Sequence, residues 1–268
     1  MKKALRLLSV LCVAALMVFA LSACGGGSTP TPPAEEETEG EEVANAAHFV
    51  IYSDNAFAPF EFASPTGDYV GVDMDILAAI AADQGFTYDM MNEGFDAAMG
   101  AVQSGNADGM IAGMTITETR METFDFSDGY FEDGQIMVVA ADSEIASLED
   151  LQGKTVAAKM GTMGTEFVRS IEAEYGLTVV DYEDSLTMYA AVMQGSCDVC
   201  FEDRSVIEWA IQQDGLALKT IGDVINPSYY GFATKKGENA DLIAMFNAGL
   251  ENIRASGEYD AILATYGY

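Results

Sequence analysis

Stretches of strand length alternate with stretches of helix length from residue 48 onward, and this alternation constrains the fold more than any other feature. The first strands are expected over 48–53, 69–72, 86–91 and 107–113, and the first helices over 74–84 and 95–104. Asp73 can cap the first of these helices, and Gly85 can end it. Strands that are joined through helices lie parallel in one sheet, so the alternation predicts an α/β fold around a parallel sheet.

The pattern begins again after residue 134. Further strands are expected over 135–140, 155–159, 177–182, 197–202, 216–221 and 229–234, and helices over 147–153, 161–175, 185–194, 206–213, 241–255 and 258–266. The simplest architecture is two α/β lobes, with residues 48–134 and a return segment, 229–268, in the first lobe and residues 135–228 in the second. Two crossings, near 130–134 and 228–232, would join the lobes and form a hinge.

The N-terminus has the pattern of an export signal. Lys2, Lys3 and Arg6 precede an apolar run that ends in Leu-Ser-Ala-Cys at residues 21–24. This run is too short for a stable membrane span, so residues 1–23 are predicted to be a signal peptide. The tetrad resembles a lipobox, in which Cys24 would be lipidated and become the mature N-terminus. The alternative is a plain secretory signal in which this cysteine has no role.

Residues 24–47 are rich in glycine, proline and glutamate and contain almost no bulky apolar side chain. Such a segment cannot bury enough surface to offset its ordering entropy, so a disordered tether is expected. The formal net charge of −31 excludes nucleic acid as a partner. An anionic membrane surface would repel the chain as well, which makes the lipid the expected anchor.

The cysteines do not indicate a disulfide framework. Cys12 would leave with the signal, and Cys197 and Cys200 lie three residues apart in an expected strand. That spacing is about 10 Å along a strand, beyond the roughly 7 Å Cα limit for a disulfide, so both are expected to be buried thiols. A zinc site would need further ligands, but the single histidine, His48, is distant in sequence. No metal and no cofactor are therefore expected.

Residues 111–130 contain the most informative polar side chains. This segment leaves an apolar strand, places a hydroxyl at Thr115, and then presents Arg120 in a chain with only 12 lysines and arginines. A guanidinium fork binds a carboxylate through two hydrogen bonds, and hydroxyl and backbone N–H groups can complete the shell. The segment is thus a candidate carboxylate site. A surface arginine on a short helix is the alternative.

The same segment carries a resemblance to a known family. Ala-Gly-Met-Thr-Ile-Thr-Glu-Thr-Arg followed by Phe-Asp-Phe-Ser-Asp-Gly-Tyr resembles the core signature of extracellular solute-binding protein family 3, the polar amino-acid-binding proteins of ABC importers. Residues 54–62, 71–75, 161–162 and 197–203 match in order, so the resemblance covers about residues 48–268. It implies a bilobed periplasmic-binding-protein fold, a ligand cleft between the lobes, and an ABC transporter permease as partner.

The resemblance also implies which residues hold the ligand's charged groups. Arg120 would bind the carboxylate from the first lobe, with help from Thr115 and the Gly113 backbone. The N-terminus of the helix expected over 161–175, which carries Gly161 and Thr162, would help from the second lobe, because unpaired N–H groups there attract anions. Asp203 would bind the ammonium group. Alternatively, Thr162 belongs to an ordinary turn and cap, and Asp203 caps a helix.

Further residues would surround the ligand's side chain. Phe57 and Phe95 match the aromatic walls of the family's site, although both could be plain core residues. Lys159 and Glu202 are the specificity candidates, and Asp54 occupies a strand end in the first lobe. Lys159 favours an oxygen, whereas the two acids favour a donor, so a glutamine-like ligand is expected first and a basic amino acid second. In the alternative, Lys159 points to solvent.

The leading hypothesis is a substrate-binding lipoprotein, anchored on the outer side of the cell membrane, that acts as a monomer and delivers an amino acid to a permease. Two other hypotheses remain open. Some proteins that resemble this family are cyclohexadienyl dehydratases, and Glu202 could act as a general acid with a raised pKa. An amino-acid sensor component is the third; it would need a signalling partner, because no further domain is expected after Tyr268.

Overall fold

The computed structural model describes residues 46–268. The expected signal peptide (1–23), the lipidation site at Cys24 and nearly all of the expected tether lie outside the described residues. Within the described range, no helix combines the length and the apolar character that crossing a membrane requires.

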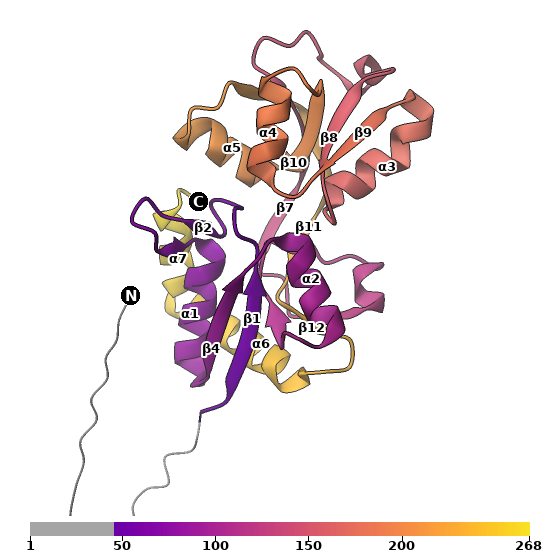
Figure 1. Ribbon diagram of the computed structural model, residues 1–268. Helices are drawn as coiled ribbons and strands as arrows, with labels where there is room; N and C mark the ends of the chain where they lie inside the picture. The colour runs from indigo at the N-terminus through magenta and orange to yellow at the C-terminus, as the bar shows by residue number, and fades with distance from the viewer. Residues whose placement is uncertain (1–45) are drawn as a thin grey trace, which may run out of the picture. The chain divides into compact units, whose positions relative to one another are not determined.

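The first lobe contains a five-stranded sheet in the order β4-β1-β5-β12-β6. Figure 1 labels β4, β1 and β12 of this sheet. Its strands are β1 (His48–Ser53), β4 (Thr87–Asn92), β5 (Gly109–Met110), β6 (Phe124–Phe126) and β12 (Ala233–Lys235). Strand β1 runs parallel to β4 and β5, whereas β12 is antiparallel to β5 and β6. The late strand β12 therefore brings the chain back into the first lobe.

Helices cover both faces of this sheet. They are α1 (Val72–Gln84), α2 (Phe95–Ser104), α6 (Ala240–Ser256) and α7 (Glu258–Thr265). Ile51 of β1 packs in a core with α1 and α6, and its neighbour Tyr52 packs in a separate core with α2, because successive side chains of a strand face opposite sides. A hairpin of β2 (Phe62–Ala63) and β3 (Tyr69–Val70) and the short helix η1 (Arg120–Glu122) complete the lobe.

The second lobe contains a sheet in the order β11-β7-β10-β8-β9. Its elements are β7 (Phe131–Ala140), η2 (Leu148–Leu151), β8 (Thr155–Lys159), α3 (Met163–Tyr175), β9 (Thr178–Tyr182), α4 (Ser185–Met193), β10 (Val199–Asp203), α5 (Arg204–Gln213) and β11 (Leu218–Tyr230). On β7, Val138 packs with α4 and α5, and Val139 packs with α3. The two-lobe α/β architecture expected from the alternation is thus confirmed.

Two long strands connect the lobes. At the end nearest the first lobe, β7 and β11 pair antiparallel through Phe131 with Tyr230, Glu132 with Tyr229, and Asp133 with Ser228. Tyr230 also forms an isolated bridge with Thr115 of the first lobe. The crossings expected near 130–134 and 228–232 are therefore two paired strand ends.

Several local predictions were wrong. Both sheets are mixed, because β12 enters the first sheet, and β7 the second, antiparallel to their neighbours. Asp73 does not cap α1, which begins at Val72 with Gly71 as N-cap, and the Asp73 carboxylate is instead buried among hydrogen-bond donors. The strand expected over 229–234 is divided between β11 and β12.

The two described cysteines have the buried, unpaired thiols that the sequence predicted. Cys197 and Cys200 are buried and free, although Cys197 lies just before β10 and not within it. Among the described residues, no cluster of histidine, cysteine, aspartate and glutamate side chains could hold a metal ion.

Candidate functional site

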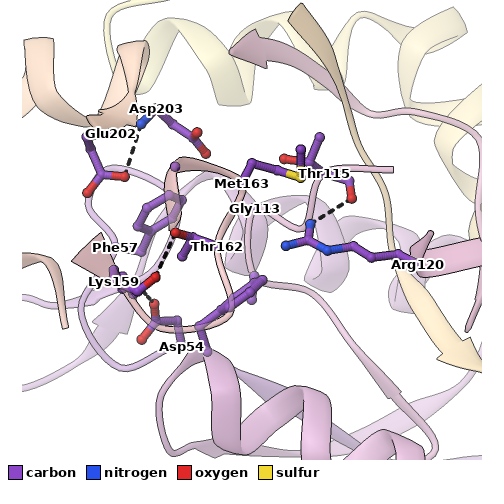
Figure 2. A pocket seen from close by; sticks show the side chains of 13 residues that line it. Asp54, Phe57, Gly113, Thr115, Arg120, Lys159, Thr162, Met163, Glu202 and Asp203 are labelled. Atoms are coloured by element: carbon purple, nitrogen blue, oxygen red, sulfur yellow. Dashed lines mark hydrogen bonds and ion pairs between the residues drawn. The ribbon is translucent and has the colours of Figure 1, made fainter. Parts of the chain in front are cut away.

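One pocket is lined by residues of both lobes and contains every site residue expected from the sequence (Figure 2). The expected residues that line it are Asp54, Phe57, Phe95, Gly113, Thr115, Arg120, Lys159, Thr162, Glu202 and Asp203. Ala112, Met163 and Gly164 line it as well. The residues come from strand ends, a helix N-terminus and connecting loops, which is where α/β sheets open to a ligand.

Arg120 lies at the start of η1 and is buried. Its Nη1 donates to the Thr115 carbonyl at 2.8 Å, and its Nη2 donates to the Gly161 carbonyl of the second lobe at 2.9 Å. The guanidinium carbon lies 5.5 Å from the centre of the Phe95 ring. These contacts fix the plane of the guanidinium, so Arg120 is a positioned cation in the pocket and not a surface side chain.

The N-terminus of α3 approaches the pocket from the second lobe. Thr162 is the N-cap, and its hydroxyl accepts from the Thr165 N–H, so the expected helix begins two residues later than predicted. No acceptor among the described residues bonds the N–H groups of Met163 and Gly164, which leaves two helix N-terminal donors at the pocket. Such donors, together with the helix dipole, favour an anion.

Gly161 allows the lobes to approach closely at this point. Its backbone has φ +76°, and a Cβ there would lie 2.6 Å from Met99 Cε of the first lobe. A side chain at this position would keep α3 away from α2.

Gly113 does not offer its N–H to the pocket. That N–H donates to Asp73 Oδ2 at 2.8 Å, within the first lobe. The Gly113 N–H is therefore not available to the ligand's carboxylate, contrary to what the resemblance implied. The Gly113 carbonyl oxygen is an acceptor, which suits an ammonium group and not a carboxylate.

Asp203 is the last residue of β10 and is held by donors from the strands that connect the lobes. Gln135 Nε2 donates to Oδ1 at 2.7 Å, and the Tyr230 hydroxyl donates to Oδ2. Burial and the neighbouring Glu202 raise the pKa of Asp203 to about 6 despite these hydrogen bonds. A bound cation would favour the ionised form of this carboxyl group.

Lys159 and Asp54 form an ion pair between the lobes, and both side chains are at most 2% exposed. The Lys159 Nζ also lies 4.6 Å from the centre of the Phe57 ring. Burial alone would lower the pKa of Lys159, but the charges of Asp54, Glu202 and Glu61 outweigh it and raise that pKa. The alternative in which Lys159 points to solvent is wrong.

Glu202 is also buried beside Lys159. The Tyr189 hydroxyl donates to its Oε2 at 2.8 Å, and the Asp203 N–H donates to its Oε1 at 3.0 Å. Burial raises the pKa of Glu202, while Lys159 and these donors oppose that effect. The pocket thus combines one lysine with two acids at the same end.

Sequence reasoning missed the residues that support the site. Met163 was not among the expected site residues, and it lines the pocket because it is the first residue of α3. Gln135 and Tyr230 donate hydrogen bonds to Asp203, and Tyr189 donates one to Glu202. The residues that these hydrogen bonds join are 13 to 68 positions apart in the chain. No spacing rule links such distant positions, so only the fold could identify them.

Known proteins match this chain over nearly all of its described length. The family model for bacterial extracellular solute-binding proteins, family 3, matches residues 49–268. The chain belongs to this family. A probable histidine-binding protein of Neisseria gonorrhoeae is 31% identical to this solute-binding protein, over 94% of the chain and 92% of the relative.

Solved structures of amino-acid-binding proteins share the fold. An ancestral arginine-binding protein bound to glutamine is 33% identical, covers 82% of this solute-binding protein and 98% of its own chain, and has a TM-score of 0.76. Substrate-binding domain 2 of GlnP from Lactococcus lactis, in an open conformation, is 42% identical and has a TM-score of 0.58. The match covers 83% of this solute-binding protein and 96% of the GlnP domain. The members of this family are extracytoplasmic binding proteins that serve ABC transporters.

If Asp203 binds a cationic group, the affinity for the ligand should decrease as the pH is lowered. The pKa of Asp203 is raised to about 6, and a proton competes with the ammonium group for the same carboxylate. We expect the ligand Kd to be about tenfold higher at pH 5 than at pH 7, because the ionised fraction falls about tenfold per unit below the pKa. Isothermal titration calorimetry at both pH values measures this ratio.

Asp203→Asn is the control for this experiment. It should bind more weakly at pH 7 and depend less on pH. A wild-type Kd that is equal at pH 5 and pH 7 would contradict the role of Asp203.

Proposed function

We propose that this solute-binding protein captures a polar amino acid, with a glutamine-like ligand as the first choice, and delivers it to the permease of an ABC importer. The observation that carries the proposal is the arrangement of opposite charges in one buried pocket. Arg120 and the free N–H groups of α3 suit a carboxylate, and Asp203 suits an ammonium group. Only an α-amino acid or a close analogue satisfies both.

The other end of the pocket supports an amide side chain. Lys159 can donate to a carbonyl oxygen, and Asp54 or Glu202 can accept from an NH₂ group. A carboxylate side chain would lie against two acids, and a cation would lie beside the lysine. The ligands named for the relatives, histidine, arginine and glutamine, all carry side-chain N–H groups, which supports glutamine first and a basic amino acid second.

Ligand preference tests this assignment. Glutamine should bind at least about tenfold more tightly than leucine, because an apolar side chain leaves buried polar partners unpaired. Lys159→Met should remove much of that preference, and Arg120→Ala should weaken binding of every amino acid by at least about 30-fold. Scanning fluorimetry with all proteinogenic amino acids, followed by calorimetry, measures the ranking. An aliphatic amino acid as the tightest ligand would contradict the glutamine assignment.

The lobes are further proposed to close over the ligand about the paired strand ends Phe131–Asp133 and Ser228–Tyr230. The Lys159 to Asp54 ion pair and the Arg120 to Gly161 hydrogen bond both join the lobes. The ancestral arginine-binding protein bound to glutamine has a higher TM-score with this protein than the open GlnP domain has, although its sequence is less identical. This difference supports a closed arrangement of the described lobes.

Closure should change the fluorescence of the single tryptophan, Trp209. Trp209 of α5 lies 6.4 Å from the Phe62 ring and 6.3 Å from the Tyr266 ring of the first lobe, measured between ring centres. Opening would expose the indole to water, so ligand should shift the emission to shorter wavelength and reduce the radius of gyration. Arg120→Ala should show neither change. Identical scattering profiles with and without saturating ligand would count against a hinge.

Catalysis is not part of the proposal. Two donors and Lys159 lower the pKa of Glu202, although burial outweighs them and the pKa is raised overall. The members of the family are binding proteins. Turnover of prephenate or arogenate by the purified protein would contradict a purely binding role.

The protein is also proposed to be a monomer that a lipid on Cys24 holds at the outer face of the membrane. The Leu-Ser-Ala-Cys tetrad supports the lipid anchor, because it resembles a lipobox. A diacyl anchor would provide the stable membrane attachment that a strongly acidic protein surface cannot. Cys24→Ala should move the protein from the membrane fraction into the periplasm or medium. Immunoblots of both fractions measure this, and a variant that stays wholly in the membrane fraction would rule the anchor out.

A further inference from the structure

Two acidic residues lie behind the pocket, inside the first lobe. Glu61 precedes β2, and Asp73 lies in the first turn of α1; neither side chain has any exposed surface. Asp73 Oδ2 accepts from the Gly113 N–H at 2.8 Å and from the Tyr130 hydroxyl at 2.7 Å. Gly113 lines the amino-acid pocket, and Tyr130 directly precedes β7.

The hydrogen-bond donors around these acids are too few for two carboxylates. No N–H or O–H group of the described residues donates to either oxygen of Glu61 or to Oδ1 of Asp73. The carboxyl groups of Glu61 and Asp73 are within hydrogen-bond reach of each other. A hydrogen bond between two carboxyl groups requires a proton on one of them, and two buried carboxylates in contact would repel each other strongly.

We propose that Glu61 and Asp73 hold one proton between them and act as positioning residues for the amino-acid site. Glu61 donates the proton to Asp73, and the Asp73 carboxylate holds the Gly113 loop and Tyr130 in place. Tyr130 packs against Tyr230, with ring centres 6.2 Å apart, and the Tyr230 hydroxyl donates to Asp203. The pair therefore connects the first lobe's part of the ligand site with the aspartate of the second. This inference rests on the proposed amino-acid site.

The surrounding charges agree with one shared proton. Burial, Asp73 and Asp54 raise the pKa of Glu61, while Lys159 opposes them. Burial raises the pKa of Asp73 to about 6, although the Gly113 N–H, Tyr130 and Glu61 lower it. Tyr69 of β3 also faces the pair, and burial and Glu61 raise its pKa, so it remains neutral. The hydrogen bond between the two groups raises the pKa of Glu61 and lowers that of Asp73, which agrees with a proton on Glu61.

Two substitutions of similar size separate this proton from simple packing. Glu61→Gln replaces the carboxyl proton by an amide N–H and should leave the Kd for glutamine within about threefold of wild type. Glu61→Met fills the same space without a donor and should weaken binding by about tenfold or more, because Asp73 loses a hydrogen bond. Glu118→Gln, at an exposed position, is the control for removing an acidic residue. Calorimetry with glutamine measures each Kd.

Infrared difference spectroscopy observes the proton without any ligand. The wild type at pH 7 should show a protonated carboxylic acid band that Glu61→Gln removes and Glu118→Gln retains. This reading stays valid if the protein binds another amino acid, so failure of the proposed function is distinguishable from failure of the pair. A wild type without the band, or Gln and Met variants of equal affinity, would overturn the inference.

Discussion

Charged side chains are buried between the lobes, and each needs a partner that the opposite lobe or the connecting strands supply. Lys159 meets Asp54 across the pocket, Arg120 donates to the Gly161 carbonyl, and Tyr230 donates to Asp203. A buried charge that loses its partner is strongly unfavourable. This arrangement of the lobes therefore depends on these pairs, or on ligand groups that replace them.

The proposed closure requires the lobes to move against each other, and most of their hydrophobic cores lie in separate clusters. Val206 of α5 is the exception, because it packs in the main core of the first lobe. The cores of the first lobe lie around β1, and those of the second lie on the two faces of β7 and β10. Among the strands that the structure describes, β7 and β11 run from one lobe to the other and pair at that end. In the proposed opening, the polar pocket residues, Val206 and the Trp209 contacts would be exposed, whereas the other core contacts within each lobe would remain. In the proposed closure, the ligand would supply the free energy through a few strong contacts.

Much of this molecule could be predicted from local patterns. The strand 48–53, the helix 95–104 and the strand 155–159 have the bounds that the sequence indicated, because apolar periodicity and glycine stops are local signals. All ten site residues line one pocket, since strand ends in α/β folds meet at one edge. The supporting partners Gln135, Tyr189 and Tyr230 were not predicted.

By itself, the sequence determined the α/β class and the two lobes, because these depend on local periodicity. Its resemblance to a known family indicated the polar residues at the cleft. The tertiary structure decided which charges meet. Asp73 looked like a helix cap and is a buried acceptor beside Glu61; Lys159 had an open choice between ligand and solvent and pairs with Asp54. Burial and pairing are properties of distant segments brought into contact, and a linear pattern contains no information on which donor reaches which acceptor.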